Sequence, residues 1–290
     1  MKEDNKKEIE ITIGSTEKEA DYITRKIIEF NDNKIKEERK TEKINLILKN
    51  EEGEIFGGIL SGLFFNCLRI YVHWVDEEYR NLGYGEKLLL AVEKIAREKG
   101  CELIYFSPYS FKNPEFYKKH DYRVIGIEDN FSGGYKRYYL RKYISVELKD
   151  REELKVSKEY TADDEKYLIQ KYIDEFHKSK AGHDEESEEI NLTLKDDKER
   201  LIAGILSKRV MEYLWISFLW VDDKYRGLGY GKKLLLELEK IAKEKGYKLI
   251  RLDTFSFQAP KFYEKLNYKL IAVEDDCPKG HTHYFFNKEI

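Results

Sequence analysis

Apolar and polar positions follow one another along the chain in a way that predicts alternating strands and helices. In the second half, residues 214–221 are almost continuously apolar, which is typical of a central strand covered on both faces. Residues 231–245 have apolar positions at helical spacing and are followed by Gly246, a residue typical of a helix C-terminus. Further elements are predicted as a helix after Thr161, strands at 190–194, 201–206, 249–252, 268–273 and 283–287, and a short helix at 259–266. We therefore expect an α/β fold around a mixed sheet.

The same pattern occurs twice, at a constant spacing of 146 residues, with about half of the positions from Ile44 onward identical and no gap required. Repeated segments include Trp74-Val75-Asp76 with Trp220-Val221-Asp222, Tyr79-Arg80 with Tyr225-Arg226, and Pro114, Phe116, Tyr117 and Tyr122 with Pro260, Phe262, Tyr263 and Tyr268. A period this long indicates a duplicated domain rather than a solenoid unit. We predict two tandem domains, residues 1–146 and 147–290, called below the N-terminal copy and the C-terminal copy.

A glycine-rich turn lies between the apolar strand and the long helix of each copy. It reads Arg80-Asn81-Leu82-Gly83-Tyr84-Gly85 in the N-terminal copy and Arg226-Gly227-Leu228-Gly229-Tyr230-Gly231 in the C-terminal copy. Glycines allow the backbone to approach a ligand, and the N–H groups at the head of a helix attract an anion. A tight strand-to-helix turn alone would also explain glycines here. Their position after a buried strand, beside an arginine and in both copies, favours a diphosphate site.

Two other glycine-loop sites do not fit these residues. A dinucleotide-binding loop needs GxGxxG and an acid after the next strand. Asp253 provides that acid, but the third glycine is misplaced at Gly231, and the N-terminal copy has Asn81 and Ser107 at the first-glycine and acid positions. A P-loop needs Ser or Thr after its Gly-Lys pair, and Lys233 stands there instead.

The motif Arg-x-x-Gly-x-Gly between a strand and a long helix resembles the acyl-CoA signature of the GNAT superfamily of N-acetyltransferases. Residues 260–268 resemble the second motif of that family, with Asn267, and Asp121 in the N-terminal copy, where a glycine is expected. Both residue types tolerate the left-handed backbone that a glycine would adopt. The resemblance covers most of both copies and is weakest in the first thirty or so residues of each. It implies two tandem domains, each with a mixed, mostly antiparallel central sheet flanked by helices.

The resemblance also implies that acetyl-CoA is the co-substrate and that an amine attacks its thioester directly in a ternary complex. The backbone near Trp220-Val221 and Trp74-Val75 would hold the pantetheine arm like an added strand. The implied cofactor-binding residues are Trp220, Val221, Arg226, Gly227, Leu228, Gly229, Tyr230, Gly231 and Lys232, with Trp74, Val75, Arg80, Asn81, Leu82, Gly83, Tyr84 and Gly85 in the other copy. Tyr263 and Tyr117 match the tyrosine that protonates the departing thiolate, although core packing would also explain a tyrosine at these positions.

The residue that deprotonates the acceptor amine is not defined by a motif. His281 is a candidate because it precedes the last strand, at the end where acceptors enter in this family, and titrates near neutrality. Carboxylate candidates are Asp253, Glu274 and Asp275, and an ordinary surface or loop role remains open for each. Glu175 would line the acceptor pocket, or else its pairing with Glu29 reflects only the duplication.

The two copies are not equivalent. Gly280-His281-Thr282-His283 has the counterpart Gly134-Tyr135-Lys136-Arg137, and the stretch 256–260 differs from 110–114. We hypothesise that the C-terminal copy is catalytic and that the N-terminal copy has diverged into a structural or acceptor-shaping partner, or takes another acceptor. A non-catalytic acyl-CoA sensor or scaffold remains the alternative function.

Composition narrows the partners. The 53 basic and 56 acidic residues leave a net charge of -3, which excludes a generally basic surface for nucleic acid. No apolar run approaches the ~18 residues of a membrane helix, and the first ten residues have no apolar core of a secretory signal. The three widely spaced cysteines predict reduced thiols rather than a disulfide or metal site. We expect a cytoplasmic protein that acts on a small-molecule or peptide amine, with its halves packed as an internal pseudo-dimer.

Overall fold

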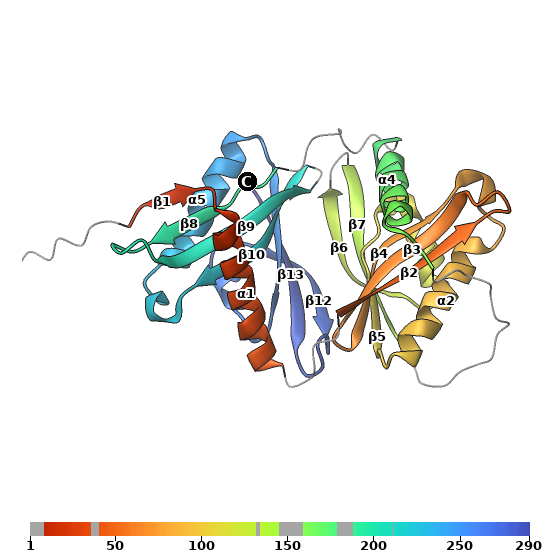
Figure 1. The fold of residues 1–290 in the computed structure, drawn as a ribbon, viewed down its shortest axis with the longest axis horizontal. Coiled ribbons are helices and arrows are strands. Elements are labelled where there is room, and N and C mark those ends of the chain that lie inside the picture. The colour runs from red at the N-terminus through yellow and green to blue at the C-terminus, as the bar shows by residue number, and fades with distance from the viewer. Residues whose placement is uncertain (1–8, 36–40, 132–133, 145–158, 179–187, 211) are drawn as a thin grey trace, which may run out of the picture. The chain divides into compact units, whose positions relative to one another are not determined.

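The computed structural model describes residues 9–35, 41–131, 134–144, 159–178, 188–210 and 212–290 (Figure 1). The chain forms two compact units. Unit 1 comprises Met1–Lys36, Asp184–Leu270 and Phe285–Ile290, and unit 2 comprises Glu37–His183 and Ile271–Tyr284. Each unit therefore combines segments of both copies, whereas the sequence repeat predicted a single division at residue 146.

Unit 1 contains most of a seven-stranded sheet with the strand order β1-β8-β9-β10-β11-β13-β12, and the parts of β12 and β13 within Ile271–Tyr284 belong to unit 2. Strand β10 pairs in parallel with β11, whereas the pairs β1–β8, β8–β9 and β9–β10 are antiparallel. The strands of this sheet are β1 Ile11–Ile13, β8 Leu192–Lys195, β9 Leu201–Val210, β10 Tyr213–Val221, β11 Leu249–Phe255, β12 Lys269–Asp275 and β13 Thr282–Glu289. The helices of unit 1 are α1 Glu17–Lys34, α5 Tyr230–Glu244 and α6 Pro260–Glu264.

Unit 2 repeats this plan on a six-stranded sheet with the order β2-β3-β4-β5-β7-β6. Again one internal pair, β4–β5, is parallel and the remaining pairs are antiparallel. Its strands are β2 Thr41–Lys49, β3 Ile55–Phe64, β4 Cys67–Val75, β5 Leu103–Phe106, β6 Arg123–Phe131 and β7 Tyr135–Tyr143. Its helices are α2 Tyr84–Glu98, α3 Pro114–Lys118 and α4 Ala162–Lys178. Two tandem mixed sheets flanked by helices confirm the predicted fold class.

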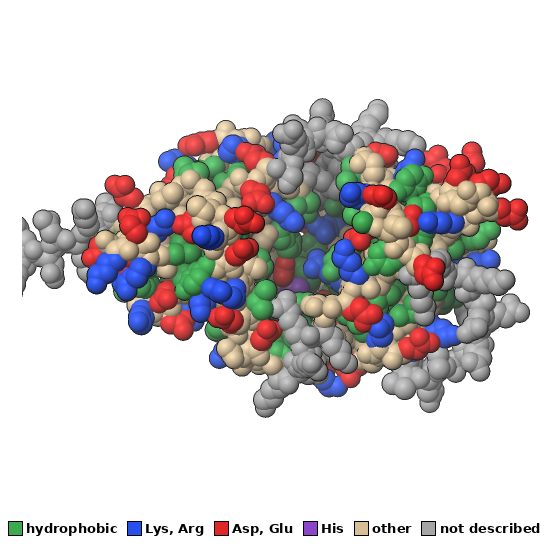
Figure 2. Space-filling view, viewed as in Figure 1, with side chains coloured by type: hydrophobic (Ala, Val, Ile, Leu, Met, Phe, Trp, Pro, Cys, Tyr) green, Lys and Arg blue, Asp and Glu red, His purple; other side chains and the backbone are tan. Residues whose placement is uncertain are grey.

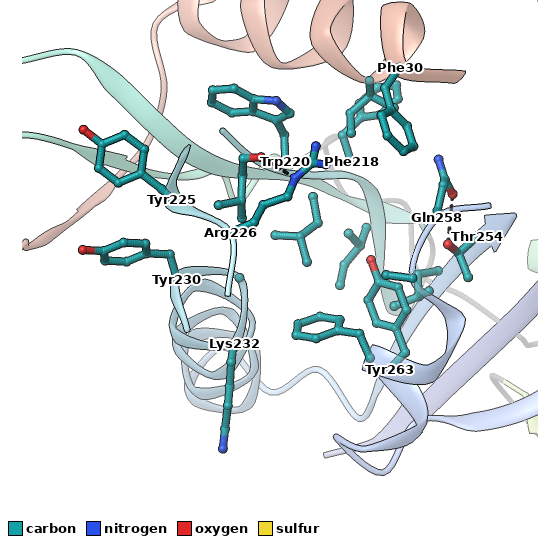
Figure 3. Close-up of a pocket in the computed structure, with 18 of the residues that line it drawn as sticks. Phe30, Phe218, Trp220, Tyr225, Arg226, Tyr230, Lys232, Thr254, Gln258 and Tyr263 are labelled. Carbon is teal, nitrogen blue, oxygen red and sulfur yellow. Dashed lines mark hydrogen bonds between the residues drawn. The ribbon is translucent and has the colours of Figure 1, made fainter. Parts of the chain in front are cut away.

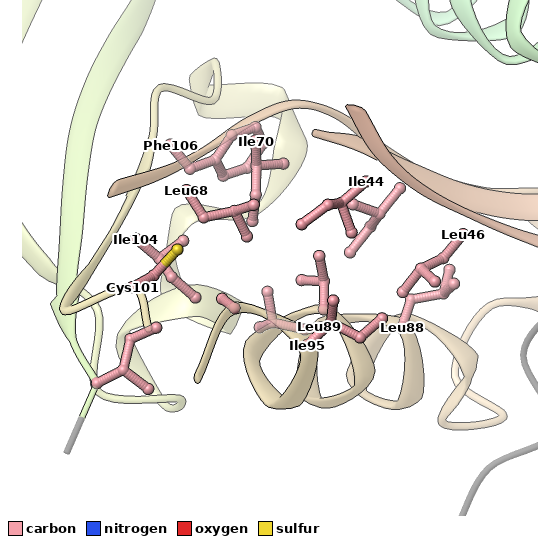
Figure 4. Packing of buried hydrophobic residues seen from close by; sticks show 14 of the residues in the cluster. Ile44, Leu46, Leu68, Ile70, Leu88, Leu89, Ile95, Cys101, Ile104 and Phe106 are labelled. Atoms are coloured by element: carbon pink, nitrogen blue, oxygen red, sulfur yellow. The ribbon is translucent and has the colours of Figure 1, made fainter. Parts of the chain in front are cut away.

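The core of unit 2 shows why the long helix forms at this place. Leu88, Leu89 and Val92 recur at helical spacing on α2 and are fully buried. They pack against apolar residues of the sheet such as Ile44 and Leu68, as Figure 4 shows for this cluster. Because burial of a leucine stabilises a fold by roughly 1.5–3 kcal/mol, this apolar stripe fixes the helix on one face of the sheet. In unit 1 the helix α5 buries the corresponding leucines, Leu234 and Leu235.

The helices α1 and α4 occupy equivalent places in the sequence repeat but are exchanged between the copies. Helix α1, from the N-terminal copy, packs on β9 and β10 of the C-terminal copy. Helix α4, from the C-terminal copy, packs on β3 and β4 of the N-terminal copy (Figure 1). Each helix approaches its sheet at a glycine, where a Cβ on Gly204 would overlap Ile23 and a Cβ on Gly58 would overlap Leu168. Each sheet is thus covered by the first helix of the other copy.

One cysteine prediction is wrong. Cys67 and Cys277 form a disulfide within unit 2, with their Cα atoms 6.2 Å apart, while Cys101 is free and buried. The two bonded cysteines are separated by 210 residues. A pairing over that separation leaves no spacing pattern in the sequence, and only the fold brings the two Cα atoms into the usual range for a disulfide.

Acidic and basic side chains are interspersed over the face seen in Figure 2, in line with the nearly balanced composition. Among the described residues, no helix has both the length and the apolar character required to cross a membrane.

Candidate functional site

Unit 1 contains a cavity of about 570 Å³ beside the glycine-rich turn (Figure 3). Its walls come from β10, the turn, the head of α5, the end of β11, the helix α6 and one face of α1. The predicted diphosphate site therefore lies in one cavity with α6, which carries the second sequence motif, and with α1, which comes from the other copy.

The cavity opens because β10 separates from β11. The two strands pair in parallel only at Leu214–Ile250 and Trp215–Arg251. A β-bulge at Ser217 follows immediately, where the register with β9 shifts between Ile216 and Phe218. A bulge bends a strand and interrupts its pairing. The remainder of β10, residues 218–221, lines the cavity and offers a strand edge to an extended ligand, which fits the expected role of Trp220 and Val221.

The backbone of the turn and of the N-terminus of α5 is suited to bind an anion. Gly227 and Gly229 have φ of 77° and 87°, in the left-handed region that favours glycine. Gly229 is the N-cap of α5 and provides no side chain to cap the helix. The first N–H groups of a helix have no acceptor within the helix and carry the positive end of its dipole. No acidic residue occupies the first turn of α5, so these groups are available to a phosphate.

Arg226 stands at the start of this turn. Its Nε donates a 3.1 Å hydrogen bond to the carbonyl of Val221, and its guanidinium lies 5.3 Å from the ring centre of Phe30. The exposed Asp223 pairs with it at 2.8 Å. These contacts hold a cation at the rim of the cavity, where it would meet a phosphate group.

Tyr263 provides the hydroxyl of the site. It lies on α6, is largely buried, and directs its hydroxyl into the space between α6 and β10 (Figure 3). Its ring packs against Phe262 and Tyr268. Burial, and secondarily the charge of Asp253, raises the pKa of Tyr263 above its usual value. The phenol is therefore protonated at neutral pH and able to give a proton to an anion that forms beside it.

Asp253 lines the same cavity from the end of β11. Among the four carboxylate and histidine candidates from the sequence, it is the one that the structure places with Tyr263. The two groups have complementary chemistry, because an ionised carboxylate accepts a proton and a protonated phenol donates one. Together they could serve the two proton transfers of an acyl transfer to an amine.

Helix α1 closes the cavity with residues that sequence analysis did not identify. Ile27 and Phe30 line it, and Asn31 accepts a 2.8 Å hydrogen bond from Nε2 of Gln258. Gln258 is fixed in turn by its Oε1, which accepts from the Thr254 hydroxyl and from the Phe255 N–H, both at 2.9 Å. This end of the cavity is therefore both aromatic and rich in amide groups. In the sequence, Phe30 and Phe176 lie at the repeat spacing of 146 residues. This match did not show that α1 lines the cavity of the other copy.

The structure brings together most of the cofactor-binding residues predicted for the C-terminal copy. Trp220, Val221, Arg226, Gly227, Gly229, Tyr230, Gly231 and Lys232 all line the cavity. Lys232 does so with its backbone, because its side chain points away from the site in Figure 3. Leu228 is the exception, since it is exposed and does not line the cavity. The corresponding residues of the N-terminal copy, Trp74, Val75, Arg80, Asn81, Leu82, Gly83, Tyr84 and Gly85, lie in unit 2 together with Tyr117.

The remaining candidates lie elsewhere. His281, Glu274 and Asp275 belong to unit 2 and do not line the cavity of unit 1. Burial raises the pKa of Glu274 to about 8. Glu29 is exposed and pairs with Lys26 at 2.9 Å. The side chain of Glu175 lies outside the described part of the structure.

Comparison with known proteins places these features in a family. The model of the acetyltransferase (GNAT) family matches residues 12–122 and again residues 151–268. A blasticidin-S acetyltransferase of Streptomyces morookaense is 34% identical over 95 residues, which are 32% of this chain and 70% of that protein. An acetyltransferase of Agrobacterium fabrum is 25% identical over 94 residues, 32% of this chain and 69% of that protein. The crystal structure of an acetyltransferase from Bacillus cereus has 41% identity and a TM-score of 0.44, and the match covers 45% of this chain and 94% of that one.

Proposed function

The chain belongs to the acetyltransferase (GNAT) family, and we propose that it transfers the acetyl group of acetyl-CoA to the primary amine of a small molecule or peptide in the cavity of unit 1. Acetyl-CoA is the co-substrate of this family, as the sequence predicted. The observation that carries the proposal is the presence of the glycine turn, Tyr263 and Asp253 in one cavity.

The donor would enter along β10. Its diphosphate would bind at the head of α5, between the backbone N–H groups and Arg226, and its pantetheine arm would lie along residues 218–221. A donor on this path would have its thioester between β10 and α6, beside the hydroxyl of Tyr263. A fixed path of this kind supports catalysis because it aligns the thioester with the attacking amine.

The reaction is a direct displacement at the thioester carbonyl. The amine nitrogen forms a bond to the carbonyl carbon, and the carbon–sulfur bond breaks. Asp253 takes the proton that the amine loses, directly or through a water molecule. Tyr263 gives its proton to the departing thiolate, and the products are an amide and coenzyme A. Asp253 then releases its proton to solvent and Tyr263 regains one, which restores both groups.

The acceptor would bind at the end formed by Asp253, Gln258 and α1. A carboxylate attracts a cationic amine, and the aromatic ring of Phe30 lines the same cavity. The relative named for blasticidin-S supports a small polar amine as the acceptor.

The test is release of free thiol from acetyl-CoA in the presence of single amines, among them nucleoside antibiotics, aminoglycosides, polyamines and short peptides. We expect one class to accelerate the release and to yield the acetylated amine by mass spectrometry. Tyr263→Phe should lower kcat about 100-fold with unchanged binding of acetyl-CoA. Tyr167→Phe, at an exposed position on α4 in unit 2, is the control and should retain the rate. Tight binding of acetyl-CoA without turnover on any amine would instead support the sensor alternative.

A further inference from the structure

The spacing of 146 residues allows the two copies to be compared position by position. The backbone of the glycine turn is the same in both. Gly83 has a φ of 84° where Gly229 has 87°, and Asn81 has 63° where Gly227 has 77°. Arg80 bonds the carbonyl of Val75 just as Arg226 bonds that of Val221. The backbone of the glycine turn therefore does not distinguish the copies, and a difference in ligand binding has to come from other parts of the site.

One difference is at His73, which takes the place of Leu219. Its Nδ1 lies 3.0 Å from the hydroxyl of Tyr117, the counterpart of Tyr263. Its Nε2 lies 3.6 Å from the position that a Cβ on Gly85 would take, at the head of α2. The imidazole thus reaches from the helix head to the tyrosine hydroxyl.

In the C-terminal copy the same space belongs to the cavity. Leu219, Gly231 and Tyr263 all line it. The side chains nearest to a Cβ on Gly231 are Val221 at 3.6 Å and Phe262 at 3.7 Å, and the residue at position 219 is not among them. A donor that runs from the head of α5 to Tyr263 must use this space, and in the N-terminal copy the buried ring of His73 fills it.

Three further positions have lost the chemistry of the site. Ser107 replaces Asp253, and its hydroxyl accepts a 2.9 Å hydrogen bond from Arg137. Lys112 replaces Gln258, and its Nζ lies 4.3 Å from the ring centre of Tyr172 on α4. Glu86 replaces Lys232 in the first turn of α2, where a negative charge competes with a phosphate for the helix N-terminus.

We propose that the N-terminal copy is closed to acyl-CoA because His73 occupies the donor path and engages Tyr117, so that each chain has one acetyl-transfer site. The N-terminal copy contributes to that site by supplying α1 as its wall. This inference rests on the proposed function, since it assumes that the cavity of unit 1 binds acetyl-CoA.

The protonation state of His73 agrees with this role. Burial lowers its pKa to about 4, against the opposing effect of a hydrogen bond with the backbone of Gly85, and the charges of Lys112 and His120 lower the pKa further. The ring is therefore neutral at pH 7 and offers no positive charge to a phosphate. A neutral imidazole has one donor and one acceptor nitrogen, and Nδ1 is used by Tyr117 in either tautomer.

The experiment is to count acetyl-CoA molecules bound per full-length chain by equilibrium dialysis at saturation. We expect one for the wild type and none for Gly231→Val, which narrows the head of α5. His73→Leu restores the residue of the C-terminal copy and should raise the count to two, with kcat unchanged. The double variant His73→Leu/Gly231→Val should bind one, and the reciprocal Leu219→His should bind none. Circular dichroism and thermal melting verify that each variant is folded.

The wild-type count needs no substitution and is decisive by itself. Two molecules bound per wild-type chain would overturn the closure. If none is bound, both the proposed acyl-CoA site and this inference are wrong. If Gly231→Val still binds one molecule, the acyl-CoA site lies in the N-terminal copy, and this inference is wrong. A count that stays at one in folded His73→Leu would remove His73 as the residue that closes the path.

Discussion

The amide of Gln258 donates a 2.8 Å hydrogen bond to the side chain of Asn31, across 227 residues of sequence. The bond joins α1 of the N-terminal copy to the turn before α6 of the C-terminal copy. Because Gln258 also accepts from Thr254 and from the backbone of Phe255, its orientation is fixed from both sides. The wall of the cavity is therefore shared between the two copies.

Removal of Asn31 should affect the acceptor but not the donor. In Asn31→Ala, one neutral hydrogen bond of about 1 kcal/mol is lost, and Gln258 gains freedom at the acceptor end. We expect about a fivefold rise in the acceptor KM with an unchanged dissociation constant for acetyl-CoA. Steady-state kinetics with each substrate varied in turn measure both. Asn33→Ala, at an exposed position on the same helix, is the control, and an equal effect of the two variants would contradict the role of Asn31.

The close approach of α1 to β9 should make Gly204 sensitive to a single methyl group. In Gly204→Ala the new Cβ collides with Cδ1 of Ile23, and such overpacking costs about 1–3 kcal/mol. Ile23→Val removes the colliding atom, at an expected cost of about 1 kcal/mol when made alone. Urea unfolding of the full chain should show the double variant to be more stable than the sum of the two single effects predicts. Strict additivity would mean that the two residues do not meet in solution.

Asp253→Asn should lower activity in a way that depends on pH. If Asp253 accepts the proton of the amine, kcat/KM at pH 7 should fall about 100-fold. The loss should diminish as the pH approaches the pKa of the acceptor amine, since less of the amine then has to be deprotonated before it attacks. A pH profile of wild type and variant measures this. Asp197→Asn, in an exposed turn, serves as the control, and a loss that is constant across the pH range would argue for a purely structural role of Asp253.

The burial of neutral His73 should make folding sensitive to acid. Its pKa is about 4 in the folded protein and about 6.5 when exposed. Below pH 6.5 the unfolded chain binds a proton that the folded chain does not, so this contribution to stability is complete above pH 6.5 and declines as the pH falls toward 4. The decline should reach about 3 kcal/mol in the wild type and be absent from His73→Leu. Urea unfolding between pH 4 and 7 compares the two slopes, and parallel curves would show that His73 does not titrate in this way.

The sequence by itself determined the duplicated fold and the chemistry of the turn. Both depend on local patterns, such as the apolar run of β10, the helical spacing in α5 and the glycines at 227 and 229, whose backbone angles only glycine adopts readily. Tyr263 followed from a motif of neighbouring residues. These features were predictable because each is encoded within one short segment.

The tertiary structure alone decided which helix covers which sheet. Helices α1 and α4 have equivalent positions in the repeat, and both sheets present a glycine to the incoming helix, Gly204 or Gly58. Apolar periodicity therefore fits either pairing, and only the structure shows Ile23 of α1 at Gly204 and Leu168 of α4 at Gly58. The same holds for His73, which in the sequence is one polar residue in an apolar strand. Its effect on the site depends on distances to Tyr117 and Gly85, residues from two other elements that only the fold brings together.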